Sequence, residues 1–145
     1  FINVDFNVLS QLEMVSKPPG IEVILEISEV EALHDVDNHL KVARRWRAEG
    51  YKFAIDDFGA GFISLPFIAQ LVPEYIKLDR STMLQAVGSE KFRKFSKDLV
   101  QALRNYSTEG IIAEGVETEK ELKVVKSIGI YLVQGYLLGK PQELK

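Results

Sequence analysis

The sequence predicts an α/β fold built on a parallel sheet, and two observations carry that prediction. Short runs rich in β-branched and apolar residues alternate with amphipathic helical segments along the chain, which is the rhythm of βαβ units. The runs also end in polar or acidic residues, and parallel strands bring such ends to one edge of a sheet. The pattern alone leaves two architectures open: an open doubly wound sheet, and most of a (β/α) barrel.

The strand predictions rest on short apolar runs. Most of these runs are apolar on both faces, as expected of parallel strands that helices bury. The candidate strands are Ile2–Asp5, Val23–Ile27, Phe53–Asp56, Tyr75–Asp79, Ile111–Ala113 and Tyr131–Gln134.

Three amphipathic segments between these runs are predicted to be helices. Apolar residues at helical spacing form the core face of the first, which stops at Gly50. The second has an N-cap at Ser89 and an apolar face that includes an aromatic stripe. The third opens with a capping box at Thr118–Glu121 and ends near Gly129. The two predicted core faces are Leu33, Val36, Leu40 and Ala43, and then Phe92, Phe95, Leu99, Leu103 and Tyr106.

Composition restricts the possible classes of function. The chain has 145 residues, enough for one domain, and a net charge of −3, which argues against DNA or RNA binding. It has no cysteine, which excludes disulfides, thiolate zinc sites and cysteine nucleophiles. No apolar run reaches the roughly 20 residues of a membrane span. The start, inside a predicted strand and without Met, suggests a fragment of a longer protein.

Polar residues at successive strand ends predict a shared site. Asn3 lies in the first strand, and the later strands end in or are followed by acids, a lysine and a glutamine. A lone acidic residue at a strand end is usually a helix N-cap, but a series on neighbouring strands predicts a cluster of carboxylates. Such a cluster repels itself unless hard cations such as Mg²⁺ or Mn²⁺ occupy it. The series is Glu26, Asp56, Asp57, Lys77, Asp79, Glu114, Glu117 and Gln134.

Adjacent side chains on a strand point in opposite directions. Asp56 and Asp57 can therefore both face one site only if the strand ends between them. Gly59 and Gly61 permit such a turn. Two ions bridged by a carboxylate at this position would suit hydrolysis of a phosphodiester, with Lys77 orienting the attacking water.

Five motifs in order resemble the EAL family of cyclic-di-GMP phosphodiesterases, and together they cover essentially the whole chain. They are L-E-I-S-E at residues 25–29, D-D-F-G-A-G at 56–61, I-K-L-D at 76–79, A-E-G-V-E-T at 113–118, and Q-G-Y with G-K-P at 134–141. The resemblance implies a TIM-type (β/α) barrel that is incomplete here, with about six of eight βα units present. Residues 1–145 would then be a partial EAL domain holding barrel strands 3 to 8.

The resemblance also implies residue roles. Asn3, Glu26, Asp56, Asp57 and Glu114 would bind two Mg²⁺ or Mn²⁺ ions, and Glu114 would also be a candidate general base. Lys77 would bind the attacking water. Asp79, Glu117 and Gln134 would form the polar surroundings of metal, water and substrate, while Glu29 would anchor the loop after Asp57.

The family signature E-x-L-x-R belongs to a strand upstream of Asn3 and does not occur in this sequence. Glu31-Ala32-Leu33 is not that signature, since it lies at a helix start without the arginine. We therefore expect the chain alone to be inactive, and the intact parent to hydrolyse c-di-GMP to linear pGpG. The alternative is a degenerate domain that acts as a c-di-GMP receptor or a protein-interaction module.

An unrelated acidic barrel of the enolase type would not explain the D-D-F-G and A-E-G-V-E-T motifs. The resemblance further implies a bacterial cytoplasmic location, a homodimer, and a GGDEF or sensory domain in the parent protein.

Three further interpretations concern single residues. His34 and His39 are five positions apart, which does not fit a helical metal pair, so both are expected on the surface. Trp46 is expected at the edge of the core. The aromatic stripe at Phe92, Phe95 and Tyr106 is expected inside it.

Overall fold

The computed structural model describes residues 1–28, 35–61 and 65–140. In these ranges the chain forms a parallel sheet whose strand order, β1 to β6, is the order along the sequence. The strands are β1 (Ile2–Asn3), β2 (Ile24–Ser28), β3 (Lys52–Phe58), β4 (Tyr75–Leu78), β5 (Gly110–Ala113) and β6 (Leu132–Val133). Consecutive order is typical of a barrel rather than of a doubly wound sheet, whose order reverses.

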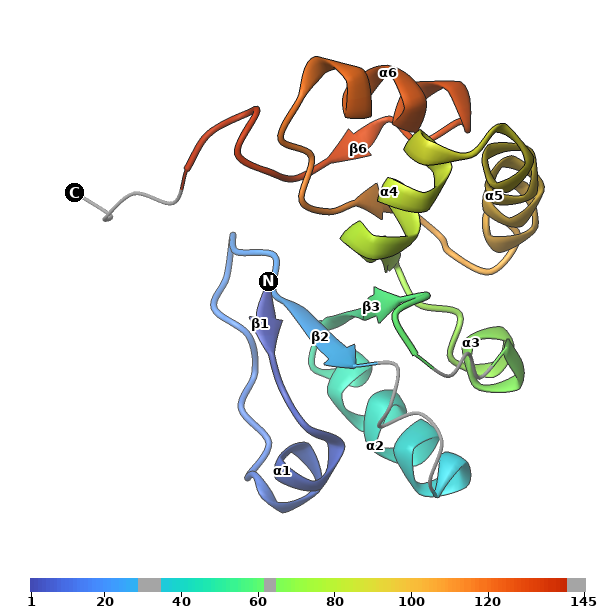
Figure 1. The fold of residues 1–145 in the computed structure, drawn as a ribbon. Helices are drawn as coiled ribbons and strands as arrows, with labels where there is room; N and C mark the ends of the chain where they lie inside the picture. The colour runs from blue at the N-terminus through green and yellow to red at the C-terminus, as the bar shows by residue number, and fades with distance from the viewer. Residues whose placement is uncertain (29–34, 62–64, 141–145) are drawn as a thin grey trace.

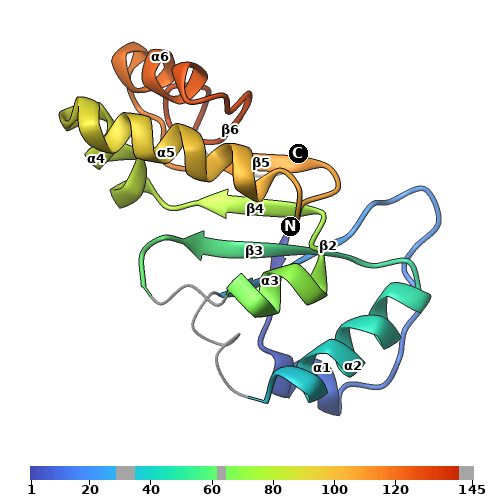
Figure 2. The same ribbon diagram turned by 90° about the vertical axis from the view of Figure 1, so that its right-hand side faces the viewer.

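The described helices all lie on one side of this curved sheet. Figure 1 shows them from α1 and α2 at the bottom, past α3 and α5, to α6 at the top, while the other side carries no described helix. In Figure 2, β3 and β4 run side by side in the same direction, with α5 above them and α3 below them in this view. The helices are α1 (Phe6–Gln11), α2 (Val36–Ala48), α3 (Leu65–Leu71), α4 (Arg80–Gly88), α5 (Glu90–Leu103) and α6 (Glu119–Ser127).

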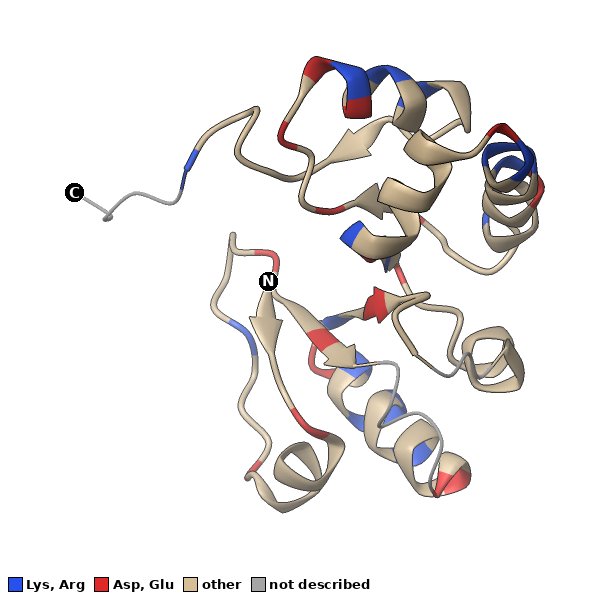
Figure 3. Cartoon of the chain, viewed as in Figure 1, with Lys and Arg blue, Asp and Glu red and all other residues tan. Residues whose placement is uncertain are grey.

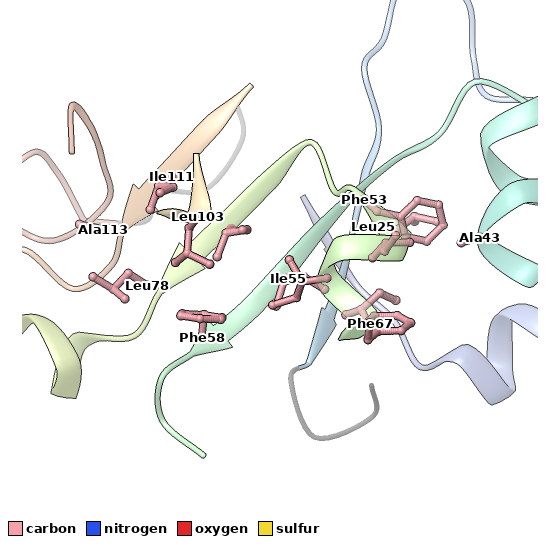
Figure 4. Close-up of a cluster of buried hydrophobic side chains, with 14 of the residues drawn as sticks. Leu25, Ala43, Phe53, Ile55, Phe58, Phe67, Leu78, Leu103, Ile111 and Ala113 are labelled. Atoms are coloured by element: carbon pink, nitrogen blue, oxygen red, sulfur yellow. The ribbon is translucent and has the colours of Figure 1, made fainter. Parts of the chain in front are cut away.

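The main core lies between the sheet and these helices. Alternate strand residues such as Leu25, Ile55 and Leu78 point toward the helices and are almost fully buried (Figure 4). Their neighbours Glu26, Asp56 and Lys77 must therefore point to the other face of the sheet. The alternation thus separates an apolar layer under the helices from a polar inner surface.

Sequence-predicted helix ends at Ser89, Thr118 and Gly50 are confirmed. The Ser89 side chain accepts a hydrogen bond from the backbone N–H of Phe92. Thr118 and Glu121 form the capping box, with each side chain bonded to the other's backbone. Helix α2 ends at Ala48, and Gly50 follows with a φ of 89°, a left-handed conformation that glycine adopts without strain.

Two burial predictions were wrong. His39 is buried rather than exposed, because its ring stacks on Phe6 of α1 at a centroid distance of 4.4 Å. The predicted aromatic stripe is not core, since Phe95 on α5 is 55% exposed and Tyr106, which lies beyond the end of α5, is 44% exposed. Ser96 takes a buried position instead, because its hydroxyl donates to the carbonyl of Phe92 four residues earlier.

Trp46 is buried, as expected, and its indole N–H donates to the carbonyl of Leu9 at 3.1 Å. This bond ties α2 to the end of α1. The interpretations of His34 and of Leu33 lie outside the described residues. Among the described residues, no helix is long and apolar enough to cross a bilayer.

An ionic cluster joins the amino-terminal ends of the central strands. The Lys52 ammonium lies between the carboxylates of Glu22 and Glu109, and the Tyr75 hydroxyl donates to Glu109 at 2.5 Å. Hydrogen bonds from Lys52 and then from Tyr75 lower the pKa of Glu109 below its ordinary value. The same bond to Glu109, together with burial, raises the pKa of Tyr75 to about 12.

We expect Glu109→Gln to flatten the acid dependence of stability. Because the pKa of Glu109 is lower in the folded than in the unfolded protein, its charge stabilises the fold above the unfolded value of 4.5. That contribution is lost as the pH falls through the folded pKa. In urea unfolding from about pH 6 to about pH 3, the variant should lose less stability than the parent. The exposed Glu13→Gln variant is the control, and equal slopes for all three proteins would contradict this role of Glu109.

Candidate active site

The carboxyl ends of four adjacent strands bring charged side chains together on the inner face of the sheet. Figure 3 shows acidic stretches on β2, on β3 and directly after β5. Parallel pairing aligns these strands, with Ser28 beside Asp56 and Leu78 beside Ala113. Glu26, Asp56, Lys77 and Glu114 therefore meet in one cluster, as the sequence predicts.

Lys77 is the centre of this cluster. Its Nζ lies 2.5 Å from Glu26 Oε1, 2.7 Å from Glu114 Oε1 and 2.9 Å from Asp56 Oδ1. The side chains of Lys77 and Glu26 are only 6% and 7% exposed. Burial opposes the charge of Lys77, but hydrogen bonds to Glu114, Glu26 and Asp56 outweigh it and raise the pKa of the ammonium. Lys77 is therefore a positive charge fixed among three acids.

Asp57 joins the cluster through an irregularity in β3. We predicted that the strand ends between Asp56 and Asp57. This was wrong, because β3 continues to Phe58. The pairing of β3 with β4 shifts register between Ile55 and Phe58, and Asp57 adopts a φ of 54°. Such a bulge lets consecutive residues turn to the same side, and aspartate tolerates the left-handed region better than most residues.

The donor set of the cluster fits a hard divalent cation. Asp56, Asp57 and Glu114 each offer a carboxylate oxygen, and these oxygens lie within 4.8 Å of one another. Burial first, and then the neighbouring charges of Asp56 and Asp79, raise the pKa of Asp57 although Lys77 opposes them. Burial also raises the pKa of Glu114, with Lys77 opposing. Acids that are destabilised by burial and by one another would gain most from a bound cation.

Asn3 and Asp79 lie beside this cluster. Asn3 is exposed on β1 and pairs in register with Glu26. Asp79 caps α4 by accepting a hydrogen bond from the backbone N–H of Ser81 at 2.8 Å, and its charge acts on Asp57. Asp79 is thus both a helix cap and an electrostatic neighbour of the site.

Glu117 and Gln134 are held by other contacts. Glu117 pairs with Arg80 at 2.8 Å. Gln134 is exposed, and its backbone connects β6 to Ala113 and Val116. Gln134 lines a hollow of about 340 Å³ that also contacts Phe1 and Tyr75. Neither residue is among the described ion-pair partners of Lys77, and Glu29 lies outside the described residues.

Two residues that support the site were missed at the sequence level. Arg80 donates to the carbonyl of Gly115 and to Glu117, which holds the loop after β5. Thr82 donates its hydroxyl to the carbonyl of Gly59 at 3.1 Å, which holds the loop after β3. Both lie in the first turn of α4, a helix that the hydrophobic pattern did not indicate, so their only signal was their position just after Asp79.

Comparison with known proteins defines the class. The family model of the EAL domain matches residues 6–141, and the chain belongs to the EAL domain family. It is 37% identical over 130 residues to the probable cyclic di-GMP phosphodiesterase PdeD of Escherichia coli K12. That match covers 90% of this chain and 24% of PdeD.

Solved structures agree with this assignment. The manganese and cyclic-di-GMP complex of Klebsiella pneumoniae BlrP1 superposes with a TM-score of 0.79 at 29% identity, over 94% of this chain and 37% of BlrP1. The c-di-GMP complex of the PaMucR phosphodiesterase superposes with a TM-score of 0.72 at 33% identity, over 81% of this chain and 47% of PaMucR. The chain thus spans less than half of each of these proteins. The sequence-based assignment to an incomplete TIM-type barrel is confirmed.

Proposed function

We propose that this chain is the carboxyl-terminal part of a phosphodiesterase domain that hydrolyses cyclic-di-GMP to linear pGpG. The observation that carries the proposal is the convergence of Lys77 on Glu26, Asp56 and Glu114 at the carboxyl edge of an EAL-family sheet. PdeD, which shares 37% identity, is named as a probable phosphodiesterase of this nucleotide. BlrP1 is described with manganese and the same nucleotide, which supports a divalent metal here, and we propose two Mg²⁺ or Mn²⁺ ions.

The residues divide into ligands and proton-handling groups. We assign Asn3, Glu26, Asp56, Asp57 and Glu114 to hold the ions, which when bound would polarise the phosphate and acidify a water. Lys77 would donate a hydrogen bond to the attacking water and orient it. Glu114, whose pKa is raised by burial, would accept the proton that this water loses. Asp79, Glu117 and Gln134 would form the polar surroundings of the ions, the water and the substrate. Glu29 would anchor the loop after Asp57.

The wider biological context is part of the same proposal. The substrate is a bacterial second messenger, so we place the protein in the bacterial cytoplasm. We also expect a homodimer and an accompanying GGDEF or sensory domain. MucR of Pseudomonas aeruginosa, 33% identical, is named as a bifunctional cyclase and phosphodiesterase, which supports such a companion domain.

The test is turnover by the full-length protein that contains these residues. Purified protein with Mn²⁺ and c-di-GMP should produce pGpG on chromatography, and Glu26→Ala should remove at least about 99% of that activity, because a buried ligand and Lys77 partner is lost. Glu13→Ala, on the surface away from the cluster, is the control. If the folded parent produces no pGpG, and Glu26→Ala is indistinguishable from it, the proposed phosphodiesterase activity is rejected.

A nucleotide receptor, the alternative that the sequence leaves open, is the second candidate. The receptor would bind c-di-GMP in isothermal titration without producing pGpG. The two measurements together therefore separate the candidates.

A further inference from the structure

The Lys77 ammonium already occupies a position built for a cation. It has three N–H donors, and three carboxylates from β2, from β3 and from the segment after β5 lie within 2.5–2.9 Å of its nitrogen. The side chain is 6% exposed, so water supplies little of its solvation. The charge of Lys77 is therefore compensated by the same oxygens that a divalent ion would need.

Two divalent ions could not bind to this cluster with equal affinity. An ion held by both Glu26 and Asp56 would require Lys77 Nζ to leave, since Nζ contacts an oxygen of each. Asp57 makes no described ion pair with Lys77, although its oxygen lies within 4.8 Å of those of Asp56 and Glu114. An ion on the Asp57 side could thus bind while Lys77 stays near Glu26.

Charge supports the same distinction. Glu26, Asp56, Asp57 and Glu114 are four acids around one lysine, so the cluster keeps an excess of negative charge when Lys77 is in place. That excess attracts a first cation. A second divalent ion would face the ammonium at a distance of a few ångströms, where repulsion between like charges in a largely buried site is large.

We propose that Lys77 is the resident occupant of one of the two cation positions, and that the ion held with Glu26 binds only by displacing the Lys77 ammonium. Lys77 would then set the affinity difference between the two positions, in addition to orienting water. The inference rests on the proposed function only in requiring that divalent ions bind at this cluster.

Direct titration with Mn²⁺ tests this without any reaction. Metal-stripped full-length protein, without nucleotide, is titrated by calorimetry, and bound Mn²⁺ is counted by electron paramagnetic resonance. The parent should bind two ions with unequal affinity. Lys77→Met should tighten the weaker position by at least about tenfold, because the competing charge is gone.

The matched control is Lys52→Met. Lys52 also lies between two carboxylates, Glu22 and Glu109, but at the opposite ends of the strands. This substitution should leave both Mn²⁺ affinities unchanged. A lysine with a purely structural role at position 77 would instead give weaker metal binding on removal, so the sign of the change decides.

Lys77→Met leaves the buried Glu26 without its described lysine partner, which could destabilise the fold. The folding of this variant is therefore measured separately. Its thermal midpoint in EDTA should fall below that of the parent and recover with Mn²⁺. A second variant, Glu26→Gln, should lose the weaker ion and keep the tighter one. Unchanged or weaker Mn²⁺ binding in Lys77→Met, or loss of the tighter ion in Glu26→Gln, would overturn this inference but not the proposed function. A parent that binds no Mn²⁺ would overturn the two-ion function as well.

Discussion

Asp56→Asn should lower phosphodiesterase activity by at least about a thousandfold, because it removes the carboxylate common to the Lys77 cluster and the candidate cation position. Asp56 Oδ1 lies 2.9 Å from Lys77 Nζ, and the same side chain completes the oxygen group with Asp57 and Glu114. An amide keeps the shape but carries no charge, and its NH₂ group offers no lone pair to a cation. Rates of pGpG formation, measured with Mn²⁺ at saturating c-di-GMP, report the loss.

Asp98→Asn is the control for this experiment, since Asp98 is an exposed aspartate on α5. Calorimetric Mn²⁺ affinity should fall in parallel with activity in Asp56→Asn and stay constant in Asp98→Asn. Retention of more than about a tenth of the parent rate, with unchanged Mn²⁺ binding, would show that Asp56 is not a ligand.

Gly135→Ala should destabilise the fold by about 1–3 kcal/mol or more, because the added methyl would overlap with backbone atoms. A Cβ at residue 135 would lie 2.2 Å from the carbonyl oxygen of Val116 and 2.3 Å from its nitrogen. The same backbone bonds Val116 N–H to Gln134 O and Leu137 N–H to Val116 O, each at 3.0 Å. The chain can make room only by separating these bonds, since no side chain is available to move.

Urea unfolding with a common fitted slope measures this change. Gly139→Ala, where a Cβ would have no atom within 4 Å, is the matched control and should change the free energy of unfolding by less than about 0.5 kcal/mol. Equal unfolding midpoints for the two alanine variants would show that the segment after β6 does not pack against Val116 as described.

The sequence predicted the site better than it predicted the packing. Acidic residues at strand ends are fixed in space by parallel pairing, so Glu26, Asp56 and Glu114 could be brought together from their positions alone. Asp57 could not, because it depends on a register shift in β3 and a positive φ that no local pattern indicates. Lys77 was expected near a water molecule, whereas its bonds to three carboxylates emerge only in three dimensions.

Burial on the helices was harder to predict because it depends on neighbours that are distant in the sequence. His39 is buried because Phe6, from a helix that we did not predict, stacks on its ring. Phe95 is exposed because α5 buries a different face, which carries Ser96, Val100 and Leu103. A polar residue whose hydroxyl bonds within its own helix can replace an aromatic residue in the core, and hydrophobic periodicity alone does not detect this.

The order of the strands has a consequence for how the chain acquires its structure. Every neighbour in the sheet is also the next strand along the sequence, from β1 through β6. Each strand emerging from a ribosome would therefore find its pairing edge already made by the preceding unit, without waiting for residues far downstream. Assembly during synthesis would then advance one βα unit at a time, and the Lys77 cluster would be completed only when the segment carrying Glu114 had been added.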